Sequence, residues 1–175
     1  MKRYIGTVEF ACFAAVSLGG TLLHFLYDWL GKAVWIAPFS GVNESTWEHM
    51  KLLFWPMLIC AAVQSFFGGK PANFWCVKVR GIILGITLIP VIFYTYNGAV
   101  GGSPDFINIA IFYVSAAVSY IYETRLFKAG KPACTAPKAA LAVLALLAVL
   151  FIAFTFFPPH IGLFKDPRTG SYGIY

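Results

Sequence analysis

The sequence predicts an all-α polytopic membrane protein, a bundle of five transmembrane helices. Hydrophobic residues make up 59% of the 175 residues, above the roughly 45–50% of a typical soluble domain, and charged residues make up 11%. The mean hydropathy of +0.75 agrees with this class. The net charge of +6 comes from basic residues spread over several connecting segments, so no nucleic-acid partner is expected.

Five apolar segments have the length of about 20 residues that a helix needs to cross a bilayer. Connectors rich in glycine and proline, such as "NGAVGGSPD" and "KAGKPACTAP", separate the later segments. The first segment follows "MKR", but Glu9 interrupts it and it is too long for a signal peptide, so we expect a retained helix. The chain is expected to form a single transmembrane domain, with helices over residues 4–30, 45–67, 74–96, 104–127 and 137–157 and a tail over 158–175.

Basic residues predict the orientation, because lysine and arginine in short loops favour the cytoplasmic side. The same end of the bundle receives nine of the 13: Lys2, Arg3, Lys70, Lys78, Arg80, Arg125, Lys128, Lys131 and Lys138. We therefore expect a multi-pass protein of the cell membrane, with a cytoplasmic N-terminus and an extracytoplasmic C-terminus. Disulfides are not expected, because no C-x-x-C pair occurs and the cysteines fall toward the reducing side: Cys12, Cys60, Cys76 and Cys134.

Polar side chains gather at the other, outer end. The stretch "GVNESTWEHMKLLFWP" places carboxylates and an imidazole at the start of the second segment. In the first segment, Ser17, Thr21, His24 and Asp28 recur at spacings of three and four, so they share one face of a helix. Ionisable groups in membrane helices usually face a protein interior or water. We expect the first four helices to enclose a polar cavity that opens outward, with the fifth mainly facing lipid.

Histidines and carboxylates on neighbouring helices are typical of a catalytic zinc site with an open water position. The expected cofactor is therefore zinc or another divalent metal, with ligands drawn from His24, Asp28, His49 and His160. His160 would reach the site if the tail folds back over the cavity as a lid. The pattern is unspecific, since the zinc-protease motif H-E-x-x-H does not occur.

The remaining polar groups of this end would serve catalysis and substrate binding. Glu48 or Glu44 would handle protons beside the metal. The side chains expected to contact substrate are Asn43, Tyr94, Asn97 and Asn108.

A structural interpretation of several of these residues is equally compatible with the pattern. Ser45 and Glu48 have the S-x-x-E spacing of a helix capping box, and Glu48 can pair with Lys51 one turn later. His24 and Asp28 could form an ordinary hydrogen bond between helices. An aromatic belt at the membrane surface would account for Trp29, Trp35 and Trp47.

The stretches "VNESTWEHMKLLFWP" and "PPHIGLFKDPRTGSYG" resemble a family of small, uncharacterised bacterial integral membrane proteins, common among Firmicutes. The resemblance covers most of the chain. It implies a compact multi-helix membrane protein and no particular activity.

Three functions are compatible with the sequence. The first is a membrane-embedded metal-dependent hydrolase that acts on a lipid or amphiphile from the outer leaflet, with membrane lipids as its surroundings and substrate source. The second is a small transporter or channel for an ion or small solute, whose polar path would depend on Glu9, Arg80, Tyr122 and Glu123. The third is a ligand-sensing or accessory subunit without catalysis.

Overall fold

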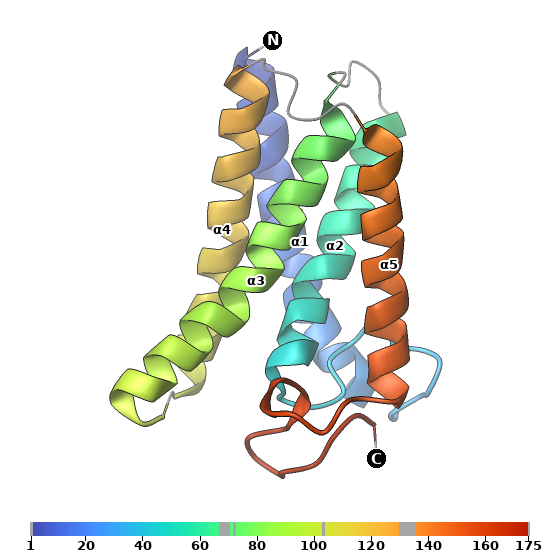
Figure 1. The fold of residues 1–175 in the computed structure, drawn as a ribbon, viewed down its shortest axis with the longest axis vertical. Coiled ribbons are helices and arrows are strands. Elements are labelled where there is room, and N and C mark those ends of the chain that lie inside the picture. Colours follow the sequence, from blue (N-terminus) through green and yellow to red (C-terminus); the bar gives the residue numbers. More distant parts are fainter. Residues whose placement is uncertain (1, 67–70, 72, 103, 130–135, 175) are drawn as a thin grey trace.

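The computed structural model is a bundle of five helices, as the sequence predicts (Figure 1). It describes residues 2–66, 71, 73–102, 104–129 and 136–174, with side chains from residue 5 onward. Each of the five helices is long and apolar enough to cross a membrane. They are α1 (Lys2–Trp29), α2 (Thr46–Phe66), α3 (Phe74–Val100), α4 (Asp105–Ala129) and α5 (Pro137–Phe156), followed by a 3-10 turn, η1 (Gly162–Phe164).

Four of the helices end close to the predicted boundaries, and α3 is longer than predicted. The helix continues through Asn97 and Gly98, which the sequence suggested as a turn, and ends at Val100. Gly101 then adopts a left-handed conformation with φ of 86°, and its N–H donates to the carbonyl of Asn97 at 2.8 Å. A glycine in this conformation commonly ends a helix, because it adopts positive φ without a steric penalty.

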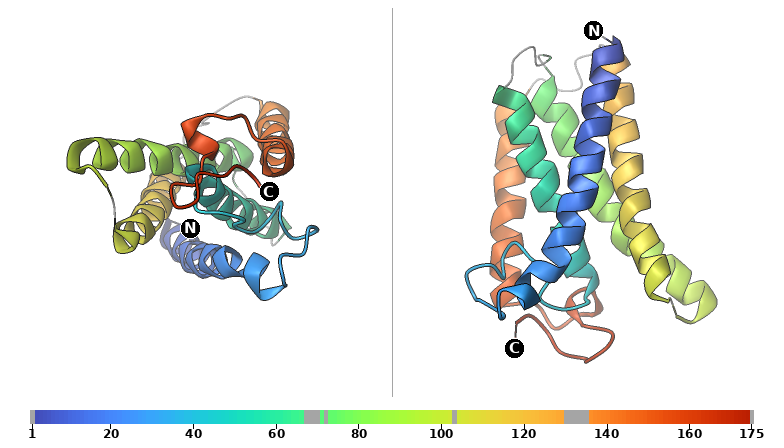
Figure 2. Two further views of the ribbon diagram at one scale, coloured as in Figure 1. Left: turned by 90° about the horizontal axis from the view of Figure 1, so that it is seen from below. Right: turned by 180° about the vertical axis from the view of Figure 1, so that it is seen from behind.

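Helices that follow one another in the chain run antiparallel, and the two termini lie at opposite ends of the bundle (Figures 1 and 2). Helices α1 to α4 pack in a ring of neighbours, while α5 lies outside it against α3. The C-terminal half of α3, which contains Pro90, leans away from the bundle together with the start of α4. We call the end that carries residues 30–45 and 157–174 the tail end.

An aromatic cluster closes the tail end of the core. Trp47 is 7% exposed, and its ring lies 4.5 Å from that of Phe151 and 4.7 Å from that of Phe164. The interpretation of Trp47 as part of an interfacial belt is therefore wrong. Trp29 and Trp35 are exposed, as a belt requires. Trp47 is drawn inward because α2 begins beneath the tail, which supplies Phe164.

A disulfide joins α1 to α2 between Cys12 and Cys60, so the expectation of no disulfide is wrong. Antiparallel packing places the two residues at the same height, with their Cα atoms 6.2 Å apart, although 48 positions separate them in the chain. Such a pairing leaves no local motif in the sequence. Disulfides belong to oxidising compartments, so the cysteines no longer support a reducing environment at this end. Cys134, Lys70 and Lys131 lie outside the described residues.

A buried ion pair anchors the tail end. Lys51 is fully buried, and its Nζ lies 2.5 Å from Oε2 of Glu48. The ammonium also donates to the carbonyl of Ala37 at 2.8 Å and to Oγ1 of Thr155 at 3.0 Å. The Glu48 carboxylate accepts in addition from the backbone N–H of Val42 at 3.0 Å. The pair thus connects α2 to Thr155 of α5 and to two points of the loop after α1, Ala37 and Val42.

The predicted capping box forms only in part. The Ser45 hydroxyl accepts from the N–H of Glu48 at 3.4 Å, as the motif requires. The Glu48 side chain does not return to the N–H of Ser45, which instead donates to Oδ1 of Asn43 at 2.9 Å. Asn43 therefore takes over this part of the cap, because Lys51 and Val42 engage the Glu48 carboxylate.

Removing one charge of the Lys51–Glu48 pair should destabilise the fold. In Lys51→Met the Glu48 carboxylate stays buried without its cation, which costs about 3–5 kcal/mol of unfolding free energy. Thermal unfolding of the purified protein in detergent should show a clear drop in the midpoint. Lys165→Met, at an exposed lysine of the tail, serves as the control.

The double variant Lys51→Met with Glu48→Gln separates charge imbalance from lost packing. It should recover a large part of the lost stability, because no buried charge remains unpaired. A double variant as unstable as Lys51→Met would contradict this account.

Candidate metal site

Two histidines and a glutamate meet at the tail end of the bundle. His24 comes from the last turns of α1, Glu44 from the loop before α2, and His49 from the first turn of α2. The Oε2 atom of Glu44 lies 3.6 Å from Nε2 of His24 and 3.7 Å from Nε2 of His49. One ligand atom from each residue falls within 4.8 Å of the others, and all three side chains are half-buried. We call these three residues the His/Glu cluster.

Local hydrogen bonds fold the loop back onto α1 and so deliver Glu44. Ser40 is fully buried; its hydroxyl accepts from the N–H of Tyr27 at 2.9 Å and donates to the carbonyl of Leu23. The N–H of Gly41 donates to the same carbonyl at 3.2 Å.

The His49 ring is oriented by its own helix. Its Nδ1 lies 2.9 Å from the carbonyl oxygen of Ser45. A carbonyl can only accept, so this bond assigns the proton to Nδ1 and leaves the lone pair of Nε2 facing Glu44. Metal-binding histidines are usually fixed in this way. Nδ1 of His24 is buried and has no hydrogen-bond partner among the described residues. The His24 ring therefore has one unsatisfied nitrogen at the site.

The His/Glu cluster borders a cavity of about 320 Å³. Its polar side is formed by the cluster together with other hydrophilic side chains, and its apolar side by aliphatic and aromatic groups of α1, α2 and α4. The wall includes Phe25 and Ile109, which are 47% and 58% exposed. These exposed apolar side chains place this wall of the cavity on the outer surface of the bundle. The lining residues are Gly20, Thr21, His24, Phe25, Glu44, His49, Leu52, Asp105, Asn108, Ile109, Phe112, Tyr113 and Arg168.

The tail contributes Arg168 to this cavity. One guanidinium nitrogen of Arg168 lies 2.7 Å from Oδ1 of Asp105, and the other lies 3.9 Å from Oε1 of Glu44. A tight turn positions it: the buried Asp166 accepts from the N–H of Arg168 at 2.8 Å and from the hydroxyl of Thr169 at 2.9 Å. The stretch "KDPRTG" forms this turn, which brings a cation to the rim of the cavity.

The surroundings of Glu44 favour its ionised form. Hydrogen bonding to His24 lowers the pKa of the Glu44 carboxyl below its ordinary value, against partial burial that raises it. The positive charge of Arg168, and that of an imidazole whenever it is protonated, lower this pKa further. Glu44 therefore carries a negative charge at neutral pH, as a metal ligand must.

Three of the residues proposed for metal binding or proton transfer lie outside the His/Glu cluster. Asp28 is exposed, one turn beyond His24. His160 stacks on Tyr172, with ring centroids 4.6 Å apart, in the tail. Glu48 is buried in the ion pair with Lys51. The tail places Arg168, and not His160, in the lining of the cavity beside the cluster.

Of the four residues proposed for substrate binding, Asn108 lines the cavity. Asn43 donates from Nδ2 to the carbonyl of Gly173 at 2.9 Å and so fastens the tail. The amide of Asn97 donates to the carbonyl of Phe93 within α3 at 2.8 Å. The hydroxyl of Tyr94 lies beside Gly162 of the tail.

Arg168, Asp105 and Tyr113 were not among the predicted site residues. Arg168 had one available signal, since it is an arginine inside a turn motif beside a polar membrane face. Asp105 had another, as an acidic residue at the same predicted end. Tyr113 had none, because a tyrosine in an apolar helix does not reveal which face of the bundle it lines.

The fold and the site define an integral, multi-pass membrane protein with a half-buried polar cluster at one end of its bundle. Residues 8–174 match DUF6512, a family of unknown function, and the chain belongs to that family. This agrees with the uncharacterised family that the two quoted stretches indicated. The curated proteins and the solved structures contain no match.

The lowered pKa of Glu44 predicts how stability depends on pH. A carboxyl whose pKa is lowered by folding stabilises the protein at any pH above its ordinary pKa of 4.5. This stabilisation is lost as the pH falls from 4.5 through the lower pKa of the folded state. Glu44→Gln should therefore unfold at a lower temperature than the wild type above that range, and the difference should shrink on acidification. Thermal midpoints measured across a pH series test this, with Asp28→Asn as the control. A difference that grows on acidification would contradict it.

Proposed function

We propose that this protein is a metal-dependent hydrolase of the membrane that acts on an amphiphile, with His24, Glu44 and His49 as the metal ligands. The observation that carries the proposal is the geometry of the His/Glu cluster. In a tetrahedral zinc site with bonds of about 2.0–2.1 Å, ligand atoms lie roughly 3.3 Å apart. The distances of 3.6 Å and 3.7 Å from Glu44 to the histidines are close to that spacing. All three ligand atoms lie within 4.8 Å of one another, so a metal would draw the two histidines together around it.

The ligand set supports a catalytic rather than a structural metal. Two histidines and one carboxylate are the protein ligands of several zinc hydrolases, which leave the fourth position for water or substrate. Here the cluster borders the cavity, so that position is accessible. The metal would act there as a Lewis acid and lower the pKa of a bound water. Iron(II) enzymes also use this ligand set, and metal analysis distinguishes the two.

The shape and polarity of the cavity favour an amphiphile as substrate. Its polar side would hold a hydrolysable headgroup near the His/Glu cluster, and its apolar side would hold part of a hydrocarbon chain. The wall with Phe25 and Ile109 lies on the outer surface of the bundle, so a lipid could enter sideways. Arg168 would bind an anionic group through charge-assisted hydrogen bonds. Asn108 would donate to a carbonyl or phosphoryl oxygen.

Metal analysis is the direct test of the proposed site. Protein purified in detergent and loaded with zinc should carry about one equivalent of metal by mass spectrometry. His24→Ala, Glu44→Ala and His49→Ala should each lose most of it, because each removes one of three ligands. His160→Ala is the matched control and should retain it, since that histidine lies in the tail against Tyr172.

Absence of metal in the loaded wild type would contradict the proposal, as would equal metal in the ligand variants. Circular dichroism and gel filtration establish that each variant is folded. If the wild type binds no metal, transport or an accessory role accounts better for the protein, and the His/Glu cluster becomes a structural contact between α1 and α2.

Arg168 should determine the preference for anionic headgroups. Arg168→Gln removes charge-assisted hydrogen bonds, and because solvent screens this exposed guanidinium, affinity should fall by roughly 10-fold. Binding of dihexanoyl phosphatidic acid to zinc-loaded protein in zwitterionic nanodiscs, measured by calorimetry, tests this. Lys165→Gln, in the same tail hairpin, is the control. An equal effect of Arg168→Gln on dihexanoyl phosphatidylcholine would contradict a role in charge recognition.

A further inference from the structure

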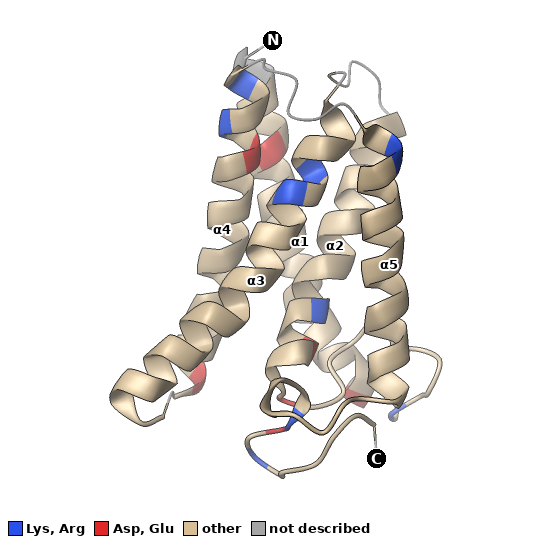
Figure 3. Cartoon of the chain, viewed as in Figure 1, with Lys and Arg blue, Asp and Glu red and all other residues tan. Residues whose placement is uncertain are grey.

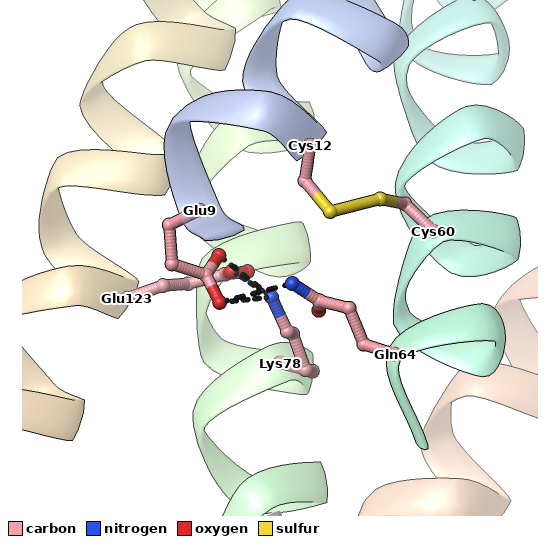
Figure 4. The surroundings of a disulfide bond; sticks show 6 residues. All are labelled: Glu9, Cys12, Cys60, Gln64, Lys78 and Glu123. Atoms are coloured by element: carbon pink, nitrogen blue, oxygen red, sulfur yellow. Dashed lines mark hydrogen bonds and ion pairs between the residues drawn. A yellow bond between two sulfur atoms is a disulfide. The ribbon is translucent and has the colours of Figure 1, made fainter. Parts of the chain in front are cut away.

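A second buried polar cluster lies toward the N-terminal end of the bundle, away from the candidate metal site (Figures 3 and 4). Nζ of Lys78 on α3 donates to both carboxylate oxygens of Glu9 on α1, at 3.0 and 2.8 Å. It also donates to Oε2 of Glu123 on α4 at 2.6 Å. Gln64 on α2 donates from its amide to Oε1 of Glu9 at 3.2 Å. One residue from each of α1 to α4 thus meets at a single point.

The charged groups of this cluster are removed from solvent. Glu9 is 4% exposed, Lys78 2% and Glu123 0%. The ammonium lies under the aromatic rings of Phe74, Tyr120 and Phe127, at 5.5–5.7 Å from their centroids. The Tyr120 phenol, on α4 like Glu123, is a further titratable group close enough to interact electrostatically with the two carboxyls. Neutral aromatic rings favour the ammonium without adding a second charge.

The charges of this cluster do not balance. Two carboxylates and one ammonium leave a net charge of −1 in an apolar interior, where an uncompensated charge is far more costly than in water. The Lys51–Glu48 pair at the tail end, by contrast, contains one charge of each sign. The cluster around Lys78 therefore requires one further positive charge. Oε1 of Glu123 marks the place, because it is buried and has no hydrogen-bond partner in the described part of the chain.

A proton meets this requirement better than a metal ion. Hard cations such as Ca²⁺ or Mg²⁺ take about six oxygen ligands. Lys78 already occupies the centre of the cluster, and the oxygens left unpartnered are Oε1 of Glu123 and Oε1 of Gln64. A proton needs one oxygen. We propose that Glu9, Lys78 and Glu123 form a proton-binding site inside the membrane, where the two carboxyls share a single exchangeable proton.

The neighbouring helix is shaped to admit this site. A methyl group at Gly81 of α3 would collide with the Glu123 carboxyl, and one at Gly85 would collide with the hydroxyl of Ser119, one turn earlier on α4. The two glycines let α4 approach α3 closely enough for Glu123 to reach Lys78. The disulfide between Cys12 and Cys60 holds α1 against α2, one turn from Glu9 and Gln64 (Figure 4). The two glycines and the disulfide thus help to hold the Glu9 and Glu123 carboxyls beside the Lys78 ammonium.

Infrared spectroscopy reads the proposed proton directly and does not depend on metal binding. The wild type in nanodiscs at neutral pH should show the carbonyl stretch of a protonated carboxylic acid, which shifts in D₂O. Glu9→Gln and Glu123→Gln should each remove this band, because either substitution balances the remaining carboxylate against Lys78. Both keep the size of the side chain, so each folded variant is a test by itself.

Glu44→Gln is the control, since that carboxyl belongs to the candidate metal site. Loss of the band in the folded glutamine variants at positions 9 and 123, with retention in Glu44→Gln, supports the proton site. A wild type without the band overturns it. A band that persists in Glu9→Gln or Glu123→Gln, or disappears in Glu44→Gln, overturns it as well.

Discussion

The buried ion pair between Lys51 and Glu48 determines the form of the tail end, because it fixes the loop that carries Glu44. Glu48 holds the backbone of Val42, and Lys51 holds the carbonyl of Ala37 and the hydroxyl of Thr155. Glu44 follows Val42 by two residues and therefore comes to rest between the histidines of α1 and α2. Burying the pair is tolerable because the charges cancel and further hydrogen bonds satisfy both groups. The position of Glu44 in the candidate metal site therefore depends on the buried Lys51–Glu48 pair.

The two ends of the bundle solve the problem of charge in an apolar surrounding differently. At the tail end the buried charges balance, and the unbalanced groups of the His/Glu cluster face a cavity. At the other end two carboxylates share one ammonium with almost no exposure. Charge that faces a cavity can be balanced by a ligand or by water, whereas charge sealed inside the bundle must be balanced by a proton. This physical difference distinguishes the two proposals.

Composition and hydrophobic length were sufficient to predict the five helices, because a bilayer imposes those properties on every segment that crosses it. His24 and His49 were also predictable as one site, since polar residues in apolar helices tend to face one another. Glu44 and Glu48 were both expected to handle protons, and the sequence did not separate them: only the path of the loop before α2 shows that Glu44 contacts the histidines while Glu48 pairs with Lys51. The Cys12–Cys60 disulfide and Arg168 depend on contacts between distant segments, which no local spacing encodes.

The elements that carry the proposed metal ligands are joined by a disulfide and by hydrogen bonds of the loop between them. The disulfide joins α1 to α2, and the loop between them is fixed at Ser40 and Val42, so His24, Glu44 and His49 belong to one braced unit. The opposite wall of the cavity comes from α4, whose first turns lean away from the bundle, and from the tail. A proposed metal needs fixed ligands, while an amphiphile needs a wall that can part. The division of the cavity between a braced half and a splayed half fits both requirements.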